Sequence, residues 1–374
     1  MKEVRPIAIY LPQFHPIPEN DAAWGEGFTE WTNVKKAKPL FKGHYQPHIP
    51  HEDVGYYDLR DSEVLIKQAA MAKEYGIYGF AFYHYWFNGK RLLNLPLDNM
   101  LKTGKPHFPF CYIWANENWT RRWDGRDNDV IISQNYSFED DVNHIRFLCE
   151  NVFSDSRYIR VNGRPFFIVY RTNKLPEPQK TTDIWREVAL KEGIGEIYLC
   201  RMEIGYFPAN PYELGFDAAI HFHPDTYNIE RLQPNVFQRI LHRLGMLKLD
   251  LYKNIVYDYI SYAKKMSDCT KVTYKRYPGI MPSWDNSARV KSNAIIFKNA
   301  SPAVYEKWLY SIKQNFIPFS SEENFIFINA WNEWAEGAHL EPDRKFGYAY
   351  LQATAEAIID SKSYKEIKWQ PFIK

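Results

Sequence analysis

Eight short runs of β-branched and aromatic residues alternate with stretches of helical periodicity, and this order constrains the fold more than any other feature. Most runs are almost continuously apolar, as expected for strands buried on both faces of a parallel sheet. The expected strands are Ile7–Leu11, Tyr78–Tyr83, Phe108–Trp114, Pro165–Tyr170, Glu196–Arg201, Ala218–Phe222, Gly279–Ser283 and Asn324–Asn329. The expected helices are Ser62–Tyr75, Phe138–Cys149, Asp183–Glu192, Val236–Lys248, Leu251–Lys265, Pro302–Gln314 and Tyr348–Asp360. Because no Gly/Ser-rich linker interrupts the series, the sequence predicts one α/β domain over residues 1–374, a (β/α)8 TIM barrel.

The chain is longer than such a barrel needs, since its 374 residues exceed the roughly 250 of a typical (β/α)8 domain. We place the surplus in three loop insertions, at Pro12–Tyr57, Asn116–Tyr136 and Pro224–Tyr277. The first two are crowded with Trp, Tyr, His and Pro, and they follow the carboxyl ends of strands, where barrel enzymes build their sites. The third is basic and amphipathic in part, and a solvated outer pair of helices is expected there rather than a membrane-docking segment.

Charge and aromatic content narrow the classes of partner. The 47 Lys and Arg side chains nearly balance 45 Asp and Glu side chains, so neither a nucleic acid nor an anionic membrane is the expected partner. Phenylalanine, tryptophan and tyrosine make up 17% of the chain. Flat apolar rings with polar edges suit carbohydrates, although an aromatic-rich core would account for the same count.

The amino terminus and the cysteines favour a cytoplasmic protein. The apolar stretch Ile7–Leu11 is too short for a secretory signal, and no small-residue cleavage site follows it. No run approaches the roughly 18 apolar residues of a membrane span. Cys111, Cys149, Cys200 and Cys269 are widely spaced, which is typical of reduced, buried thiols rather than of a disulfide framework.

The strongest local signal is the segment Trp331–Gly337, directly after the last expected strand. Glu333 and Glu336 lie three positions apart in it, flanked by two tryptophans and by the amide of Asn332. On a turn, two such carboxyls can converge on one pocket, and the tryptophans would desolvate one of them and raise its pKa. Glycosidic cleavage needs one neutral acid and one anion. We therefore expect both glutamates to be catalytic, although an isolated E-x-x-E more often caps a helix in contact with solvent.

Other expected strands end in aromatic side chains next to amides, acids or basic groups that can bind sugar hydroxyls. Each one alone fits core or loop packing, but their recurrence at one end of the barrel favours a binding site. The candidate substrate-binding residues are Trp24, Trp31, Tyr83, His84, Trp86, Trp114, Asn116, Glu117, Trp119, Glu203, His221, Trp284, Asp285, Asn286, Arg289, Trp331 and Asn332.

Two motifs suggest other chemistry. His44, His48 and His51 have zinc-binding side chains, but intervening prolines break any helix that would align them, so neither a metal nor a cofactor is expected. Asp127-Asn128-Asp129 matches the D-x-D string that holds a metal and a sugar nucleotide in many glycosyltransferases. Because the chain has no Gly-rich phosphate loop, we interpret this string as part of a charged loop.

Four segments occur in order along most of the chain: Ile9–Pro16, Trp24–Trp31, Gly79–Trp86 and Trp331–Gly337. Together they resemble the WbsX-type proteins of the glycoside hydrolase family 99-like group, which often accompany bacterial surface-polysaccharide genes and are sometimes labelled glycosyltransferases. The resemblance implies a (β/α)8 enzyme that cleaves α-mannosides with retention of configuration and without metal.

By this resemblance, Glu333 would deprotonate the sugar 2-hydroxyl, which displaces the leaving group through a 1,2-anhydro sugar. Glu336 would act as general acid and then as general base. Tyr10 and the Tyr83/His84 pair would be sugar-site residues by position, and Glu30, within the segment Trp24–Trp31, is a further candidate substrate-binding residue. Ala335 stands where hydrolase members of the family have histidine, a difference that bears on mannose specificity more than on the acid pair.

The sequence thus predicts a retaining glycoside hydrolase, endo- or exo-acting, whose substrate is a bacterial surface oligo- or polysaccharide with a usable 2-hydroxyl. The alternative is a sugar-nucleotide-dependent glycosyltransferase of O-antigen or capsule biosynthesis, which would depend on Asp127 and Asp129. A polysaccharide-binding protein without catalytic activity is the third hypothesis.

Overall fold

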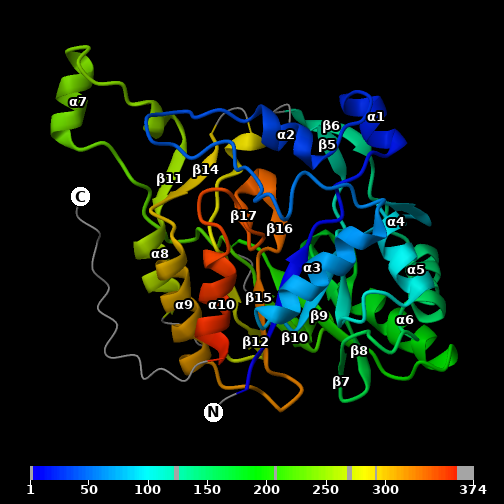
Figure 1. Ribbon diagram of the computed structural model, residues 1–374. Coiled ribbons are helices and arrows are strands. Elements are labelled where there is room, and N and C mark those ends of the chain that lie inside the picture. Colours follow the sequence, from blue (N-terminus) through cyan, green and yellow to red (C-terminus); the bar gives the residue numbers. More distant parts are fainter. Residues whose placement is uncertain (1–2, 122–125, 206–208, 268–271, 291–292, 360–374) are drawn as a thin grey trace.

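Eight parallel strands close into a barrel in the computed structural model, which describes residues 3–121, 126–205, 209–267, 272–290 and 293–359 (Figure 1). The sheet order is β12-β10-β9-β8-β4-β2-β1-β15-β13, and every neighbouring pair in this order is parallel. The predicted (β/α)8 barrel is therefore confirmed. The barrel strands are β1 (Arg5–Tyr10), β2 (Gly79–Phe87), β4 (Phe110–Trp114), β8 (Arg164–Val169), β9 (Tyr198–Glu203), β10 (Ala218–His221), β12 (Arg276–Tyr277), β13 (Gly279–Ile280) and β15 (Phe325–Ile328).

Strands β12 and β13 are two halves of the seventh strand, separated by Pro278. A proline has no backbone N–H to give to a neighbouring strand, so the ladder is interrupted there. The first half pairs with β10 and the second half with β15, while the Pro278 carbonyl still accepts from Phe327 N at 2.9 Å. Gly279 lets the strands approach closely, because a Cβ at this position would lie 1.8 Å from the carbonyl oxygen of His221.

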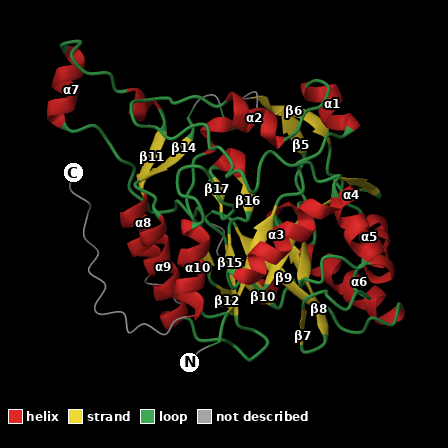
Figure 2. Ribbon diagram, in the orientation of Figure 1, coloured by secondary structure: helices red, strands yellow, loops and turns green. Residues whose placement is uncertain are grey.

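Helices surround the barrel (Figure 2). Capping residues start several of them: Asp61 accepts from the Glu63 backbone N–H, and Ser137 and Ser301 cap α5 and α9 in the same way. The prediction missed α4, a nine-residue helix with a proline in its first turn. The helices of this layer are α3 (Ser62–Glu74), α4 (Leu95–Thr103), α5 (Phe138–Asn151), α6 (Pro178–Lys191), α8 (Tyr259–Ser267), α9 (Pro302–Asn315) and α10 (Ala349–Ile359).

The expected helix Leu251–Lys265 is wrong in its first half. Strand β11 (Ile255–Asp258) occupies that half and pairs in parallel with β14 (Ile295–Lys298), a contact between distant segments that local periodicity does not encode. The expected solvated outer helix pair is also wrong, because α8 buries Tyr259 and Tyr262 in the helix layer.

Additional short elements decorate the carboxyl end of the barrel. They fall in the three segments where insertions were expected, after the seventh strand and after the last strand. They are α1 (Pro18–Trp24), α2 (Glu30–Lys36), the hairpin of β5 (Trp119–Arg121) with β6 (Arg126–Ile132), α7 (Val236–Arg243), the 3-10 turns η4 (Asp250–Lys253), η5 (Asn286–Ala288) and η6 (Trp334–Glu336), and the pair β16 (Asn332–Glu333) with β17 (Ala338–His339). The remaining elements are β3 (Lys90–Leu92), β7 (Arg160–Val161) and the 3-10 turns η2 (Thr172–Lys174) and η3 (Pro211–Leu214).

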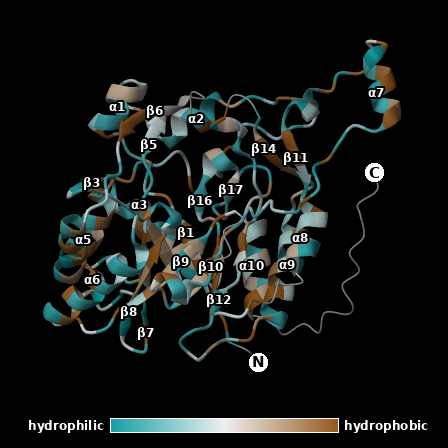
Figure 3. Cartoon of the chain, turned by 180° about the vertical axis from the view of Figure 1, so that it is seen from behind, coloured by the Kyte–Doolittle hydropathy of each residue, from teal (hydrophilic) through white to brown (hydrophobic). Residues whose placement is uncertain are grey.

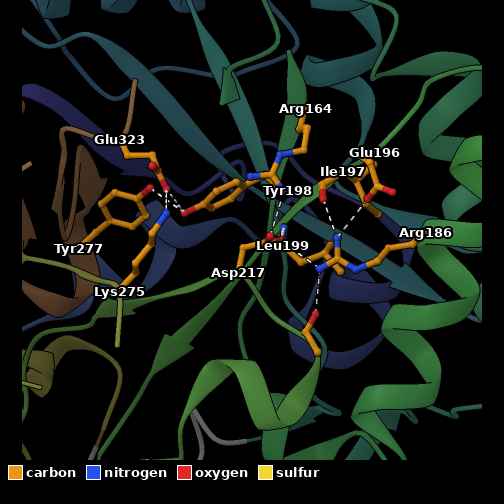
Figure 4. A network of polar contacts seen from close by, with 11 residues as sticks. Arg164, Arg186, Glu196, Ile197, Tyr198, Leu199, Asp217, Lys275, Tyr277 and Glu323 are labelled. Carbon is orange, nitrogen blue, oxygen red and sulfur yellow. Dashed lines mark hydrogen bonds and ion pairs between the residues drawn. The ribbon is translucent and has the colours of Figure 1, made fainter. Parts of the chain in front are cut away.

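A polar network ties the amino ends of the strands together, at the end of the barrel opposite these elements (Figure 4). Glu323 accepts from Lys275 Nζ at 2.6 Å and from the Tyr198 hydroxyl at 2.8 Å. Burial acts to raise the pKa of Glu323, but these hydrogen bonds outweigh it and lower the pKa. Asp217 pairs with Arg164 at 2.9 Å and with an arginine of α6. In barrels of this type, this end contributes stability and the carboxyl end contributes function.

No helix among the described residues is long and apolar enough to cross a membrane. Cys111, Cys149 and Cys200 are buried free thiols, as expected, and Cys269 lies outside the described residues.

Candidate active site

Arg289 holds three glutamate side chains together at the carboxyl end of the barrel. Its Nη2 lies 2.5 Å from Glu30 Oε1 and 2.7 Å from Glu333 Oε2, and its Nη1 lies 2.7 Å from Glu336 Oε1. Its Nε also donates to Glu30 Oε1, at 2.8 Å. We call these four residues the Arg289 cluster. All four were candidates from the sequence, and the fold assembles them from three distant segments.

A tight hairpin after β15 directs Glu333 and Glu336 toward the same guanidinium. Strands β16 and β17 pair antiparallel, and the 3-10 turn η6 joins them. The turn ends at Gly337, whose φ of 59° is in the left-handed region that favours glycine. A Cβ at Gly337 would also lie 3.1 Å from the backbone nitrogen of Asp285. On this turn, two side chains three positions apart reach one partner.

Burial dominates the electrostatics of the cluster. Glu30 is 0% exposed and Glu333 is 4% exposed. Burial raises the pKa of Glu333 to about 8; Arg289 opposes this effect, and the charges of Glu336 and Glu30 add to it. Burial also raises the pKa of Glu30, again against the opposing charge of Arg289. Glu333 is therefore mostly protonated at neutral pH, and its ionised form is a stronger base than an exposed carboxylate.

Tyrosine side chains lie near the cluster inside the barrel. Tyr83 and Tyr85 project from β2, and Tyr170 directly follows β8; the rings of Tyr83 and Tyr170 meet edge to face at 5.7 Å. Burial raises the pKa of all three phenols, and the charge of Glu333 contributes to each shift. They are therefore neutral hydrogen-bond donors. Tyr85 and Tyr170 were not among the predicted site residues, although Tyr85 lies two positions after Tyr83 and so shares its face of the strand.

A buried carboxylate, Glu341, holds the hairpin through hydrogen bonds to its two tryptophans. Glu341 was also not among the predicted site residues. It accepts from Trp334 Nε1 at 2.6 Å, Trp331 Nε1 at 3.2 Å and the Tyr57 hydroxyl at 3.0 Å. Gln68 of α3 completes the set at 2.6 Å. Burial raises the pKa of Glu341 to about 7, and these donors oppose the rise. Both tryptophans of the motif thus position the hairpin and do not offer their N–H groups to a ligand.

Three neighbouring candidates make hydrogen bonds that hold the segments around the cluster together. Asn332 exchanges two hydrogen bonds with the Leu11 backbone, at 2.8 and 3.0 Å, and so clamps the hairpin to the end of β1. Asp285 caps η5 and accepts from His44 Nε2 at 2.6 Å. Asn286 accepts from the backbone of Ile295. Trp284 is buried beside them, at 8% exposure.

Four candidates on the barrel strands face the helix layer instead of the cluster, and their assignment to the site is corrected accordingly. Tyr10 donates to a glutamine of α3 at 2.6 Å, Trp86 donates to an aspartate of α5 at 2.9 Å, and His84 lies 3.1 Å from a histidine of α5. Trp114 donates to the backbone of Trp86 at 3.2 Å. The cause is the two-residue period of a strand: because Tyr83 faces inward, His84 faces outward.

Asn116 and Glu117 link two loops at the rim. Asn116 bonds the backbone of Arg171 through both its oxygen and its nitrogen, and Glu117 Oε1 lies 2.9 Å from Arg171 Nε. The ring of Trp119 lies 5.1 Å from the ring of Tyr85 at an interplanar angle of 48°, so it contacts the tyrosine group near the cluster.

The remaining candidates lie outside the Arg289 cluster. Glu203 accepts from a tyrosine hydroxyl at 2.5 Å and from an arginine at 3.2 Å, and His221 Nε2 lies 3.1 Å from an aspartate of the following loop. Trp24 packs on Phe28 near α1. Trp31 packs against Trp334 at 5.4 Å and thereby braces the hairpin.

The three histidines of the first insertion diverge, as the intervening prolines led us to expect. His44 contacts Asp285, whereas His48 Nδ1 lies 2.9 Å from His339 Nε2. Together with Asp343, this second pair has the donor set of a divalent cation site: the three ligand atoms lie within 4.8 Å of one another and all three residues are buried. His51 contacts an aspartate of its own loop.

Solved structures with this fold include glycosidases. A glycoside hydrolase-like protein superposes with a TM-score of 0.57, 14% identity and coverage of 96% of this chain and 94% of its own. The GH99 endo-α-mannosidase from Bacteroides thetaiotaomicron superposes with a TM-score of 0.56 and 15% identity, over 95% of this chain and 96% of its own. The fold that this chain shares with these two proteins is therefore the (β/α)8 barrel.

The sequence places the chain in a particular family with this fold. Residues 6–354 match the family described as glycosyltransferase WbsX, and the chain belongs to that family. The uncharacterized protein WxcX from Xanthomonas campestris pv. campestris is 44% identical over 353 residues in each of two strains. The match covers 94% of this chain, and the chain spans about half the length, 49%, of these relatives. The resemblance inferred from the four sequence segments is confirmed.

Proposed function

We propose that this chain is a carbohydrate-active enzyme, and specifically a retaining glycoside hydrolase that acts on a bacterial surface polysaccharide. The observation that carries the proposal is the pair Glu333 and Glu336, each 2.7 Å from the guanidinium of Arg289 on one hairpin after the last barrel strand. Catalytic residues of barrel enzymes occupy this end of the strands. Membership of the WbsX family and the shared fold of the GH99 enzyme support the same class of substrate.

In the proposed mechanism, Glu333 removes the proton of the sugar 2-hydroxyl. The 2-oxygen attacks C1, the bond from C1 to the leaving oxygen breaks, and Glu336 gives its proton to that oxygen. Water then opens the resulting 1,2-anhydro sugar at C1, with its proton passing to Glu336, while Glu333 returns a proton to the 2-oxygen. Two inversions at C1 give net retention. Arg289 stabilises the ionised form of Glu333 and fixes both carboxyls in place.

The substrate is proposed to be a mannose- or rhamnose-like residue, because the mechanism uses a 2-hydroxyl beside C1. Tyr83, Tyr85 and Tyr170 supply neutral donors near the cluster, and Trp119 adds an apolar ring. Ala335 leaves a methyl group where hydrolase members carry histidine, so the preference among sugars is expected to differ from that of the mannosidases.

A glycosyltransferase is the second candidate function, and the description of the WbsX family favours it. The D-x-D string lies on strand β6 of the β5/β6 hairpin, where Asp129 is exposed. This function requires a sugar nucleotide, so calorimetry with nucleoside diphosphate sugars would detect binding that is lost on Asp127→Ala and Asp129→Ala.

The test of the proposal is a screen of purified O-antigen and capsule polysaccharides for released reducing ends. We expect Glu333→Gln and Glu336→Gln each to lower the rate by roughly 10²–10⁴-fold without lowering the melting temperature. Glu187→Gln on the exposed face of α6 is the matched control and should cleave like the unmodified chain.

The outcomes separate the three hypotheses. Unimpaired cleavage by either active-site variant would refute the assigned roles. Sugar-nucleotide binding without cleavage would replace the hydrolase with the transferase. Oligosaccharide that binds but is never cut would leave a binding protein.

A further inference from the structure

Helix α7 projects from the body of the molecule with its apolar side uncovered (Figure 3). None of its residues is buried, and the exposed fractions are 74% for Val236, 66% for Phe237 and 48% for Ile240. Leu244 and Met246 continue the exposed apolar surface just beyond the helix, at 65% and 73%. Positions 236, 237, 240 and 244 fall on one side of a helix with 3.6 residues per turn.

The helix has strong local signals, although no other described part of the chain buries any of its residues. Asn235 and Gln238 form a reciprocal capping box, with hydrogen bonds of 2.8 and 2.9 Å. An eight-residue helix is only marginally stable in water unless its apolar side is covered. In helices shorter than about 12 residues, the hydrogen bonds formed do not offset the free-energy cost of nucleation. A capped, amphipathic helix whose apolar side is exposed in the described structure is therefore suited to bind the surface of another molecule or assembly.

The charges around α7 indicate what that surface is. Between positions 231 and 253 the chain carries five Lys and Arg residues against a single acidic residue, Asp250. Arg239 and Arg243 lie on the helix beside its apolar side, and Lys248 follows in the next turn of chain. A hollow of about 560 Å³ next to the helix is lined by Lys248 and Lys253, and also by Asp250, which pairs with Lys253 at 2.7 Å. The near-neutral charge of the whole chain hides this local excess.

We propose that α7 and the residues that follow it, Val236–Lys248, dock this protein onto an anionic lipid bilayer. The apolar side chains enter the headgroup region, and the basic side chains pair with lipid phosphates. Helix α7 extends from the same end of the barrel as α1, α2 and the β5/β6 hairpin, so docking brings the end that holds the Arg289 cluster near the membrane (Figure 1). The inference stands on α7 alone and does not depend on the proposed reaction. It replaces the expectation from total charge that an anionic membrane is not a partner.

Co-sedimentation of the full chain with vesicles tests the proposal. We expect binding to vesicles of phosphatidylethanolamine and phosphatidylglycerol, little binding to phosphatidylcholine alone, and weakening as salt rises. Arg239→Gln with Arg243→Gln should weaken binding on the order of twentyfold, since each basic side chain near such a surface contributes about fivefold. Phe237→Asp with Leu244→Asp should weaken it at least tenfold.

Ile317→Asp is the matched control. Ile317 is 73% exposed, comparable to Phe237 and Leu244, but it lies outside α7. It should bind vesicles like the unmodified chain. Equal binding to anionic and neutral vesicles, or binding that neither α7 pair changes, would overturn the proposal. A dimer in light scattering that the Phe237/Leu244 pair dissociates, without vesicle binding, would overturn it in favour of a second copy of the chain on this helix.

Discussion

Two opposing effects set the pKa of the Glu333 carboxyl. Burial raises its pKa to about 8, and the adjacent Arg289 guanidinium restrains the rise. If Glu333 acts as the base, kcat/KM should climb about tenfold per pH unit up to this value and then level off, since only the ionised form removes a proton. Arg289→Gln removes the positive charge that lowers the pKa of Glu333, so the rise of kcat/KM with pH should move to higher pH.

The same shift can be followed without a substrate. Carbon-13 NMR of the glutamate carboxyls should show one resonance titrating near pH 8 that Glu333→Gln removes and Arg289→Gln moves upward. Arg289→Lys keeps a cation and should move it less. A titration that Arg289→Gln leaves in place would contradict the electrostatic account of the cluster.

At the same scale, the sequence drew attention to Glu333 and Glu336, but it did not show which neighbouring strand residues face the inside of the barrel. The E-x-x-E segment stands out because two acids follow a buried strand, and Arg289 and Glu30 lay within other recognisable motifs. The Tyr83–His84 pair shows where this approach fails, since adjacent strand residues face opposite sides and no local signal says which one faces inward. Glu341 was missed because its importance comes from Trp331 and Trp334 folding over it.

At the scale of elements, the junction of β10 and β13 depends on one glycine. Gly279→Ala would put a Cβ 1.8 Å from the His221 carbonyl oxygen, on a backbone atom that cannot move aside. We expect a loss of unfolding free energy on the order of 4 kcal/mol, or an insoluble chain, because the seventh strand must shift away from its neighbour.

Gly245→Ala is the matched control for this prediction. Gly245 has a φ of 71° and open space around it, so the substitution should cost only about 1 kcal/mol of backbone strain. Urea unfolding followed by circular dichroism measures both variants. Equal losses would mean that the close approach at the barrel seam is not needed.

Strands were easier to predict than the elements between them, for a physical reason. A barrel strand is apolar on both faces, so its composition alone marks it, and all eight expected strands overlap the observed ones. Strand β11 is a run of only four residues that was assigned to a helix, and it pairs in parallel with β14. The expected helix Val236–Lys248 is confirmed over Val236–Arg243 only, and only the structure shows that no described part of the chain buries its residues.

For the molecule as a whole, stability toward acid depends on histidines buried in the neutral form. His144 of α5 is 1% exposed, next to His84 and Trp86, and burial lowers its pKa to about 3 from an ordinary 6.5. A pKa lowered by folding contributes stability that is complete above pH 6.5 and is lost as the pH falls toward 3, because the unfolded chain takes up the proton first. Buried carboxyls such as Glu341 act in the opposite sense.

These opposing contributions cancel when one side chain is compared between two pH values. His144→Gln keeps a polar group beside His84 but cannot be protonated. Between pH 7 and pH 5, the unmodified chain should lose about 2 kcal/mol more unfolding free energy than this variant, the cost of leaving one histidine neutral while the unfolded chain protonates. Urea titrations at both pH values measure the difference, and His107→Gln, at an exposed histidine, should track the unmodified chain. Parallel losses in the His144 variant and the unmodified chain would show that this buried imidazole does not limit the stability of the barrel in acid.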